Sequence, residues 1–245
     1  MAMDDERGIA QLEALHALAQ QPTAIVSSTL TKTVLVSNYF YRIRCEAALA
    51  LVNCSIPKLK YLGLFHLFKL FLRYCYDPEN PNQDLFAHTY VPKLNDLSDL
   101  SEYFVRKSLI NAISRIRFEN GKTPSVVRKF LIDQLRYNDN TSNTVSIILF
   151  SLSHLLTSRF QYADGYYICT IISSAAYATV STSPPERGEL LPSEVRSEYN
   201  EEDAHLLKQA LAEVNRYRTM DRLIPSTHNN VTIAALEVSS FYFLF

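Results

Sequence analysis

The residue types that most often carry out catalysis or bind metals are present in this chain, but their spacing forms no known reactive motif. None of the six histidines lies in an H-E-x-x-H arrangement, which would place two zinc ligands one helical turn apart beside a glutamate. No G-x-S-x-G sequence provides a nucleophilic serine. Residues 120–123 (NGKT) resemble the end of a phosphate-binding loop, but Ile116 occupies the position of the upstream glycine. We therefore predict no catalytic residue, metal ligand or cofactor, and we do not expect an enzyme.

Basic side chains are the remaining candidates for binding, because they recur on several predicted helices. The net charge of −1 excludes a globally basic molecule, so only a local basic face is expected. Solvated helix faces are the ordinary explanation of such charges. If the fold aligns them, they suit a phosphate backbone or an acidic peptide. The nine candidate partner or DNA-backbone contacts are Arg42, Arg44, Arg106, Lys107, Arg115, Arg117, Arg128, Lys129 and Arg136.

The elements that would position these charges are amphipathic helices, and residues 38–54 give the clearest example. Apolar side chains recur there at spacings of three and four, which matches the helical period. The small residues Ala47, Ala48 and Ala50 would let a neighbouring helix approach closely. Such a helix cannot bury its apolar stripe alone and needs neighbours of the same kind. The predicted stripe consists of Phe40, Ile43, Ala47, Ala50, Leu51 and Cys54.

The rest of the chain supplies those neighbours, and no strand pattern demands a sheet. The expected architecture is all-α, a HEAT- or armadillo-like solenoid of antiparallel helix pairs, although no clean repeat period is found. Thr123 is the expected N-cap of one helix, with Pro124 as its first residue. Residues 77–97 are expected to be irregular. The other helices are expected at residues 4–19, 23–36, 61–76, 98–118, 124–137, up to Val180, at 201–220 and from about Ser226.

Composition indicates the kind of cellular compartment in which the chain is expected. The four cysteines lie in apolar runs without a C-x-x-C pair, which indicates reduced core residues rather than disulfides or zinc ligands. The N-terminus is acidic and polar, unlike a signal peptide. The most apolar run, residues 61–76, is shorter than a membrane span and contains His66, Lys69 and Arg73, so a core helix is expected.

Two stretches interrupt the helical pattern. Residues 145–161 (VSIILFSLSHLLTSRFQ) are apolar without period. Their first two residues can be encoded by a common intron start and their last two by a common intron end, and the segment is a whole number of codons. We therefore interpret it as a translated, unspliced intron, with a natural hydrophobic helix as the alternative. Residues 238–245 begin with the same Val-Ser and are interpreted as a second read-through that truncates the last helix. Residues 181–200 contain three prolines and are expected to be a flexible linker between helical repeats at 1–180 and 201–245.

Several stretches resemble a known family. They are SNYFYRIRCEAALALVNC (37–54), LGLFHLFKLFLRYC (62–75), LSEYFVRKSLINAISRIR (100–117), VRKFLIDQLRYNDN (127–140) and NRYRTMDRLIPSTHNNVTIAAL (215–236). In this order they resemble the helical-repeat region of the aminopeptidase-like TBP-associated subunits of the general transcription factor TFIID. The resemblance covers most of the chain apart from residues 145–161 and the last residues.

The resemblance implies a nuclear scaffold that supports core-promoter recognition in RNA polymerase II transcription. It implies docking onto other TBP-associated factors, including the flexible tail of a histone-fold subunit, and a position near promoter DNA. Members of the family have a peptidase-like part that has lost catalysis, and that part has no counterpart here. Two alternatives stay open: the regulatory C-terminal helical domain of an M1-type zinc aminopeptidase, which shares the helical architecture, and an unrelated armadillo-type adaptor.

Overall fold

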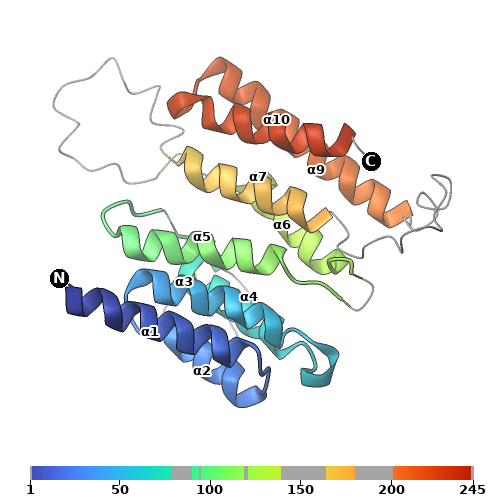
Figure 1. Cartoon of the computed structure of the whole chain (residues 1–245). Helices are drawn as coiled ribbons and strands as arrows, with labels where there is room; N and C mark the ends of the chain where they lie inside the picture. Colours follow the sequence, from blue (N-terminus) through green and yellow to red (C-terminus); the bar gives the residue numbers. More distant parts are fainter. Residues whose placement is uncertain are drawn as a thin grey trace, which may run out of the picture. The chain divides into compact units, whose positions relative to one another are not determined.

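Helices make up nearly all the regular structure in the part of the chain that the computed structural model describes, which is residues 2–78, 90–93, 95–118, 121–138, 164–179 and 201–243 (Figure 1). The chain divides into two compact units, with the boundary after Ile113. The first unit contains α1 (Ala2–Ala19), α2 (Ala24–Leu35), α3 (Tyr41–Ala50), α4 (Leu62–Cys75) and α5 (Leu100–Ser114). The second contains α6 (Ser125–Tyr137), α7 (Gly165–Thr179), α9 (Glu201–Leu223) and α10 (Asn230–Phe243).

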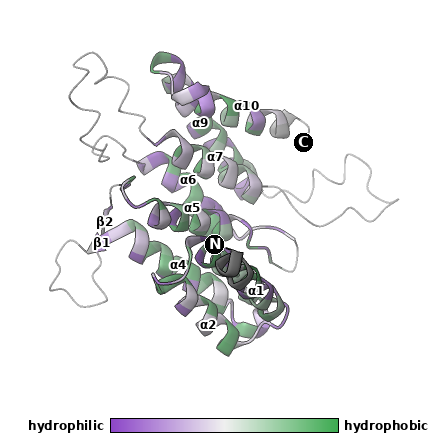
Figure 2. Cartoon of the chain, turned by 60° about the vertical axis from the view of Figure 1, so that its left-hand side comes forward, coloured by the Kyte–Doolittle hydropathy of each residue, from purple (hydrophilic) through white to green (hydrophobic). Residues whose placement is uncertain are grey.

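In the first unit, α2 lies against several of the other helices. α2 contacts α3 and α4, and α1 contacts α3. The side chains of Ala47 and Ala48 on α3 are fully buried, so the predicted close approach of a neighbouring helix is confirmed. After α3 the chain tightens into the 3₁₀ turn η1 (Leu51–Cys54), against which α4 packs. Figure 2 shows hydrophobic and hydrophilic residues side by side on helices such as α4, as expected for amphipathic helices.

The connection after α4 differs from the prediction, because part of it is regular. β1 (Tyr76–Pro78) and β2 (Tyr90–Pro92) form a short antiparallel pair, in which Asp77 lies opposite Val91. The backbone N–H of Lys93 extends this pairing by donating to the carbonyl of Cys75. Proline at the last position of each strand removes a donor, which explains why the sequence pattern gives no strand signal here.

In the second unit, α6 and α7 form one helix pair, and α9 and α10 form another. The pairs stack in register, since α6 contacts α9 and α7 contacts α10. All four helices contribute buried side chains, among them Val127, Leu131, Ile171, Val214 and Ala235. The predicted all-α fold of stacked helix pairs is therefore confirmed.

Two local predictions were wrong at helix starts. α3 begins at Tyr41, so Phe40 precedes the helix and its side chain is 57% exposed rather than part of the buried stripe. α6 begins at Ser125 with Pro124 at the N-cap position, and the Thr123 hydroxyl accepts a hydrogen bond from Arg117 instead of capping the helix.

The remaining features of the organisation stay predictions. Residues 145–161 and 181–200 lie outside the described residues, so the inserted segment and the linker are not tested. α10 continues through Val238, whose side chain is buried, to Phe243, and this does not decide the origin of residues 238–245. None of the four cysteines forms a disulfide; Cys54 and Cys75 are buried as predicted, whereas Cys45 and Cys169 are only half-buried. In the described ranges, no helix has both the length and the apolarity needed to cross a membrane.

Candidate partner-binding surfaces

Arg44 is the most buried of the nine candidate cations, with a side chain only 2% exposed. From α3 its Nε donates to the carbonyl of Val34 at 2.9 Å. Its Nη2 donates to the Tyr74 hydroxyl at 2.9 Å and to Glu102 Oε1 at 2.8 Å. Burial by itself would lower the pKa of Arg44, but the hydrogen bonds to Glu102 and Tyr74 outweigh it and raise the pKa above the ordinary value. Arg44 therefore ties α2, α4 and α5 to α3.

Arg106 and Arg117 also donate hydrogen bonds to other residues of the chain. Arg106 as a residue is 7% exposed. Its Nη2 atom donates to the carbonyl of Lys93 at 2.9 Å. Arg117 donates to the carbonyls of Ser114 and Tyr177 at 2.6 and 2.8 Å, and its guanidinium carbon lies 4.7 Å from the centre of the Tyr177 ring. Arg117 thus fastens the start of the second unit to the end of α7.

The contact between α6 and α9 is a seam in which charged and apolar pairs alternate. Arg128 Nη2 lies 2.5 Å from Asp203 Oδ1, and both side chains are nearly buried. One turn further along α6, Ile132 packs against Leu206 and Ala210. Because residue numbers rise together on both helices, α6 and α9 run parallel, as equivalent helices of successive repeats do. Arg128 is therefore part of the repeat interface.

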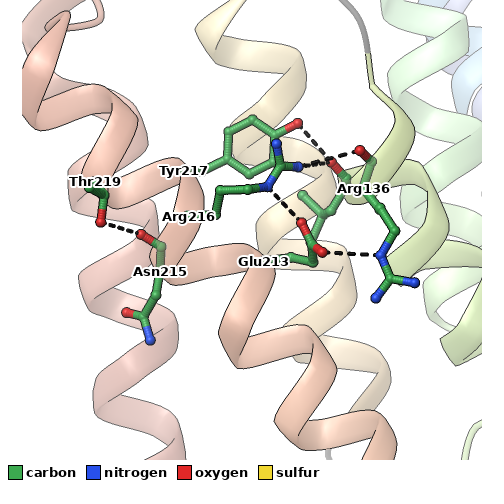
Figure 3. A network of polar contacts seen from close by, with 7 residues as sticks. Arg136, Glu213, Asn215, Arg216, Tyr217 and Thr219 are labelled. Atoms are coloured by element: carbon green, nitrogen blue, oxygen red, sulfur yellow. Dashed lines mark hydrogen bonds and ion pairs between the residues drawn. The ribbon is translucent and has the colours of Figure 1, made fainter.

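The other end of the seam is the network in Figure 3, where Arg136 and Arg216 point toward the carboxylate of Glu213. Arg136 Nε lies 3.1 Å from Glu213 Oε1, and Arg216 Nε lies 2.8 Å from Oε2. Arg216 Nη2 and the Tyr217 hydroxyl both donate to the carbonyl of Leu135, at 2.9 and 2.8 Å. These donors satisfy a carbonyl in the last turn of α6, which has no partner within its own helix.

The remaining candidates lie nearer the surface and are divided between the two units. Arg42, Arg115 and Lys129 are exposed, and the half-buried Lys107 places its Nζ 5.6 Å from the centre of the Tyr103 ring. Arg42 and Lys107 belong to the first unit, whereas Arg115 and Lys129 belong to the second. Whether any of the nine contacts a partner stays a prediction. A partner can reach the positive charge of the exposed members without a change in the packing of the helices.

Two features were missed by sequence reasoning. Arg218 and Arg222 are exposed on α9, one helical turn apart, and the structure gives neither a partner within its described residues. Their spacing of four inside a predicted helix was the available signal. The second feature is a row of exposed aromatic rings that includes Phe40 and Phe104. It was hidden because the helical period assigns Phe40 to the core.

Chemistry requiring a clustered donor set is not visible in this part of the molecule. Within the described ranges, no three His, Cys, Asp or Glu side chains gather where they could hold a metal ion. His66 Nδ1 lies 2.8 Å from the Ser27 hydroxyl oxygen, but no carboxylate is recorded beside this pair. The contacts described above for Arg44, Arg117 and Arg128 join different elements of one unit.

Comparison with known proteins gives a consistent result over nearly the whole chain. The sequence model of the family described as "TAF2-like, TPR repeats" matches residues 3–240. A protein named transcription initiation factor TFIID subunit 2 from Schizosaccharomyces pombe is 31% identical over 238 residues, covering 95% of this chain and 17% of that protein. The protein of the same name from Drosophila melanogaster is 26% identical, covering 94% of this chain and 16% of its own length.

A Saccharomyces cerevisiae protein with the same name is 30% identical over 123 residues, which is half of this chain and 8% of that protein. The chain thus spans only about a sixth of the length of the Schizosaccharomyces pombe and Drosophila melanogaster relatives. The family match extends across both compact units and agrees with their stacked helix pairs. The chain therefore belongs to the family of TAF2-like TPR repeats.

Proposed function

We propose that this chain is a helical-repeat segment of a TFIID subunit and acts as a non-catalytic scaffold in the nucleus. On it, other TBP-associated factors assemble and support core-promoter recognition in RNA polymerase II transcription initiation. The observation that carries the proposal is the family match over residues 3–240, with relatives named TFIID subunit 2. Stacked helix pairs suit this role, because helical repeats offer long, continuous surfaces to partners.

The partner surface that we favour in the second unit is the pair Arg218 and Arg222 on α9. Both side chains are exposed and lie one turn apart, so two guanidinium groups can face one acidic segment. Arginine pairs with carboxylates through two parallel hydrogen bonds, which gives direction as well as attraction. An acidic stretch in a flexible tail, such as that of a histone-fold TBP-associated factor, is the partner that we propose for this pair.

The exposed cations of the candidate set also suit the backbone of promoter DNA. Arg42, Arg115 and Lys129 are accessible, and phosphate contacts need no particular base sequence. With a net charge of −1 the chain has little general attraction for DNA. We therefore propose that DNA contact is a minor, salt-sensitive contribution to a surface that mainly binds protein.

The scaffold role is tested by tagging the chain at its endogenous locus, purifying it from nuclear extract and identifying the co-purifying proteins by mass spectrometry. Recovery of TBP and TBP-associated factors is expected. Recovery of chaperones alone contradicts the proposal.

Charge reversal then tests the arginine pair within the same assay. Arg218→Glu combined with Arg222→Glu is expected to reduce recovery of at least one TBP-associated factor about tenfold, as loss of a direct charged contact does. The control is Lys208→Glu, which reverses an exposed cation on the same helix. An equal loss in this control, or no loss in the double variant, excludes a specific role for the pair.

A further inference from the structure

A row of aromatic side chains lies at the surface of the first unit. It consists of Phe40, Tyr41 and Phe104, with Leu100 one turn before Phe104 on α5; we call these four residues the aromatic surface. Phe40 and Leu100 are 57% and 55% exposed, and Phe104 is 39% exposed. The Phe40 and Tyr41 ring centres lie 4.7 Å apart, edge to face, and those of Tyr41 and Phe104 lie 5.2 Å apart, stacked.

These contacts make the aromatic surface continuous between two elements far apart in sequence. Phe40 precedes α3, whereas Phe104 lies in the second turn of α5. Tyr103, which is buried, contacts Phe104 edge to face at 5.8 Å and anchors the row in the core. The rings are therefore held in place before any partner arrives, which lowers the entropy cost of binding.

A cation stands at the edge of this surface. Arg42 is exposed, and its Nε donates to the Tyr41 hydroxyl at 3.4 Å. The described residues place no carboxylate within ion-pair distance of Arg42, so its terminal nitrogens face solvent. Two acidic residues of α3 and α5 lie beside other side chains: Glu46 is 3.8 Å from His16, and Glu102 is 2.8 Å from Arg44.

An exposed apolar patch with a cation at its rim usually marks a protein-binding site, and aromatic residues and arginine are the types most enriched in binding hot spots. We propose that the aromatic surface with Arg42 docks a segment of a partner protein that carries a large apolar side chain next to a carboxylate. The apolar side chain covers Phe40 and Phe104, and the carboxylate pairs with the guanidinium of Arg42. This proposal rests on the scaffold role and names one docking surface for it, with the chemistry of the segment it receives.

The first experiment is a direct binding titration with the full 245-residue chain, followed by fluorescence anisotropy. The probe is a labelled synthetic peptide of twelve residues in which aspartate alternates with leucine and phenylalanine. Two comparison peptides replace every aspartate by asparagine, or every leucine and phenylalanine by serine. We expect micromolar binding of the first peptide, about tenfold weaker binding of the asparagine peptide and no measurable binding of the serine peptide.

Matched variants locate the binding. Phe40→Ser and Arg42→Glu are each expected to weaken binding of the acidic apolar peptide about tenfold. The controls are Phe65→Ser, whose side chain on α4 is 53% exposed, and Arg73→Glu, an exposed cation on the same helix. Both controls should bind like the unmodified chain, and circular dichroism must show equal helix content in all four variants.

Three outcomes overturn the proposal: no binding of the acidic apolar peptide, an equal loss in the α4 controls, or a Phe40→Ser variant that abolishes self-association in sedimentation velocity. The last outcome would identify the occupant as a second copy of the chain. If the peptide does not bind but TBP-associated factors still co-purify, only the docking inference is overturned. Absence of TBP-associated factors from the purified unmodified chain overturns the scaffold role itself.

Discussion

Arg42 and Arg44 stand two residues apart on α3 and have opposite environments. The Arg44 guanidinium is enclosed and donates to Val34, Tyr74 and Glu102, whereas Arg42 faces solvent beside Tyr41. Two residues along a helix correspond to roughly 200° of rotation, so one side chain of such a pair points inward when the other points outward. Whether a partner can reach a charge in a helical pattern therefore depends on the side of the helix on which it lies.

Replacing Arg44 by Ala is expected to lower the free energy of unfolding by about 2–3 kcal/mol, because Glu102 and the carbonyl of Val34 lose a buried charged donor. Arg42→Ala, the matched control, should leave the urea midpoint unchanged. Urea unfolding followed by circular dichroism measures both. Equal midpoints for the two variants would show that the Arg44 contacts do not stabilise the unit.

His66 provides a pH-dependent test at the same scale. Burial lowers its pKa below the ordinary value of 6.5, and the nearby Lys69 lowers it further. The unfolded chain therefore binds this proton more readily, so stability falls as the pH drops below about 6.5, until the folded-state pKa is reached. Between pH 7.5 and 5.5, His66→Gln should lose less thermal stability than the unmodified chain.

The matched control for this pH comparison is His205→Gln, which removes an exposed histidine from α9. It should keep the unmodified pH dependence. A His66→Gln variant with the full loss between pH 7.5 and 5.5 would show that burial of this imidazole does not destabilise the acid form.

At the scale of the elements, two helix contacts depend on different properties of their residues. Gly63 on α4 lies so close to η1 that an added Cβ would be 2.2 Å from the carbonyl oxygen of Leu51. The α6–α9 seam, in contrast, depends on charge: an ion pair at each end encloses an apolar centre. One contact is thus limited by space and the other by complementary side chains.

Gly63→Ala is expected to destabilise the first unit by about 1–3 kcal/mol, since the backbone of η1 must move to admit the methyl group. Gly8→Ala on α1 meets no atom within 4 Å and should instead stabilise by about 0.5–1 kcal/mol through helix propensity. Thermal unfolding distinguishes the two. A stabilising Gly63→Ala would mean that α4 and η1 are not in close contact in solution.

In the seam, a double-mutant cycle with Arg128→Ala and Asp203→Ala is expected to give a coupling of about 2 kcal/mol, because both side chains are almost buried. The Arg136–Glu213 pair, whose arginine is more exposed, should couple more weakly and lose its coupling in high salt. Equal coupling energies that do not depend on salt would contradict this assignment of the two ends.

At the scale of the whole molecule, one long connection lies between two helices that pack as a pair. The chain's relatives are several times longer, and the family match spans both compact units. The segment 145–161 separates α6 from α7, which pack together as one helix pair. Paired helices of successive repeats are normally joined by short connections. The length of this connection is consistent with an insertion, and its origin stays a prediction.

The intron hypothesis predicts a spliced transcript that joins Thr144 directly to Tyr162. Reverse-transcription sequencing across this junction is the measurement. The protein made from the joined sequence should reach at least the same unfolding midpoint, because the second unit loses a long connection. If every transcript retains codons 145–161, the segment is a natural part of the protein.

Much of the fold could be predicted. The apolar residues in 43–54, 127–135 and 207–217 recur at the helical period, which predicts both a helix and its buried face. The candidate site was predicted less well. The nine cations were chosen by type and helix, but Arg44, Arg106, Arg117 and Arg128 face other elements of their own unit. Their acceptors lie up to 75 residues away in sequence, and no local pattern reveals such a partner.

The sequence by itself therefore determined the helices, their buried stripes and the family, because periodicity and ordered motifs are properties of neighbouring residues. Only the tertiary structure decided which charges are internal, that Phe40 joins an exposed aromatic surface, and that Arg218 and Arg222 have no described partner. The physical reason is that burial and pairing depend on which helices meet. That is set by the sum of many long-range packing contacts and not by the residues on either side in the chain.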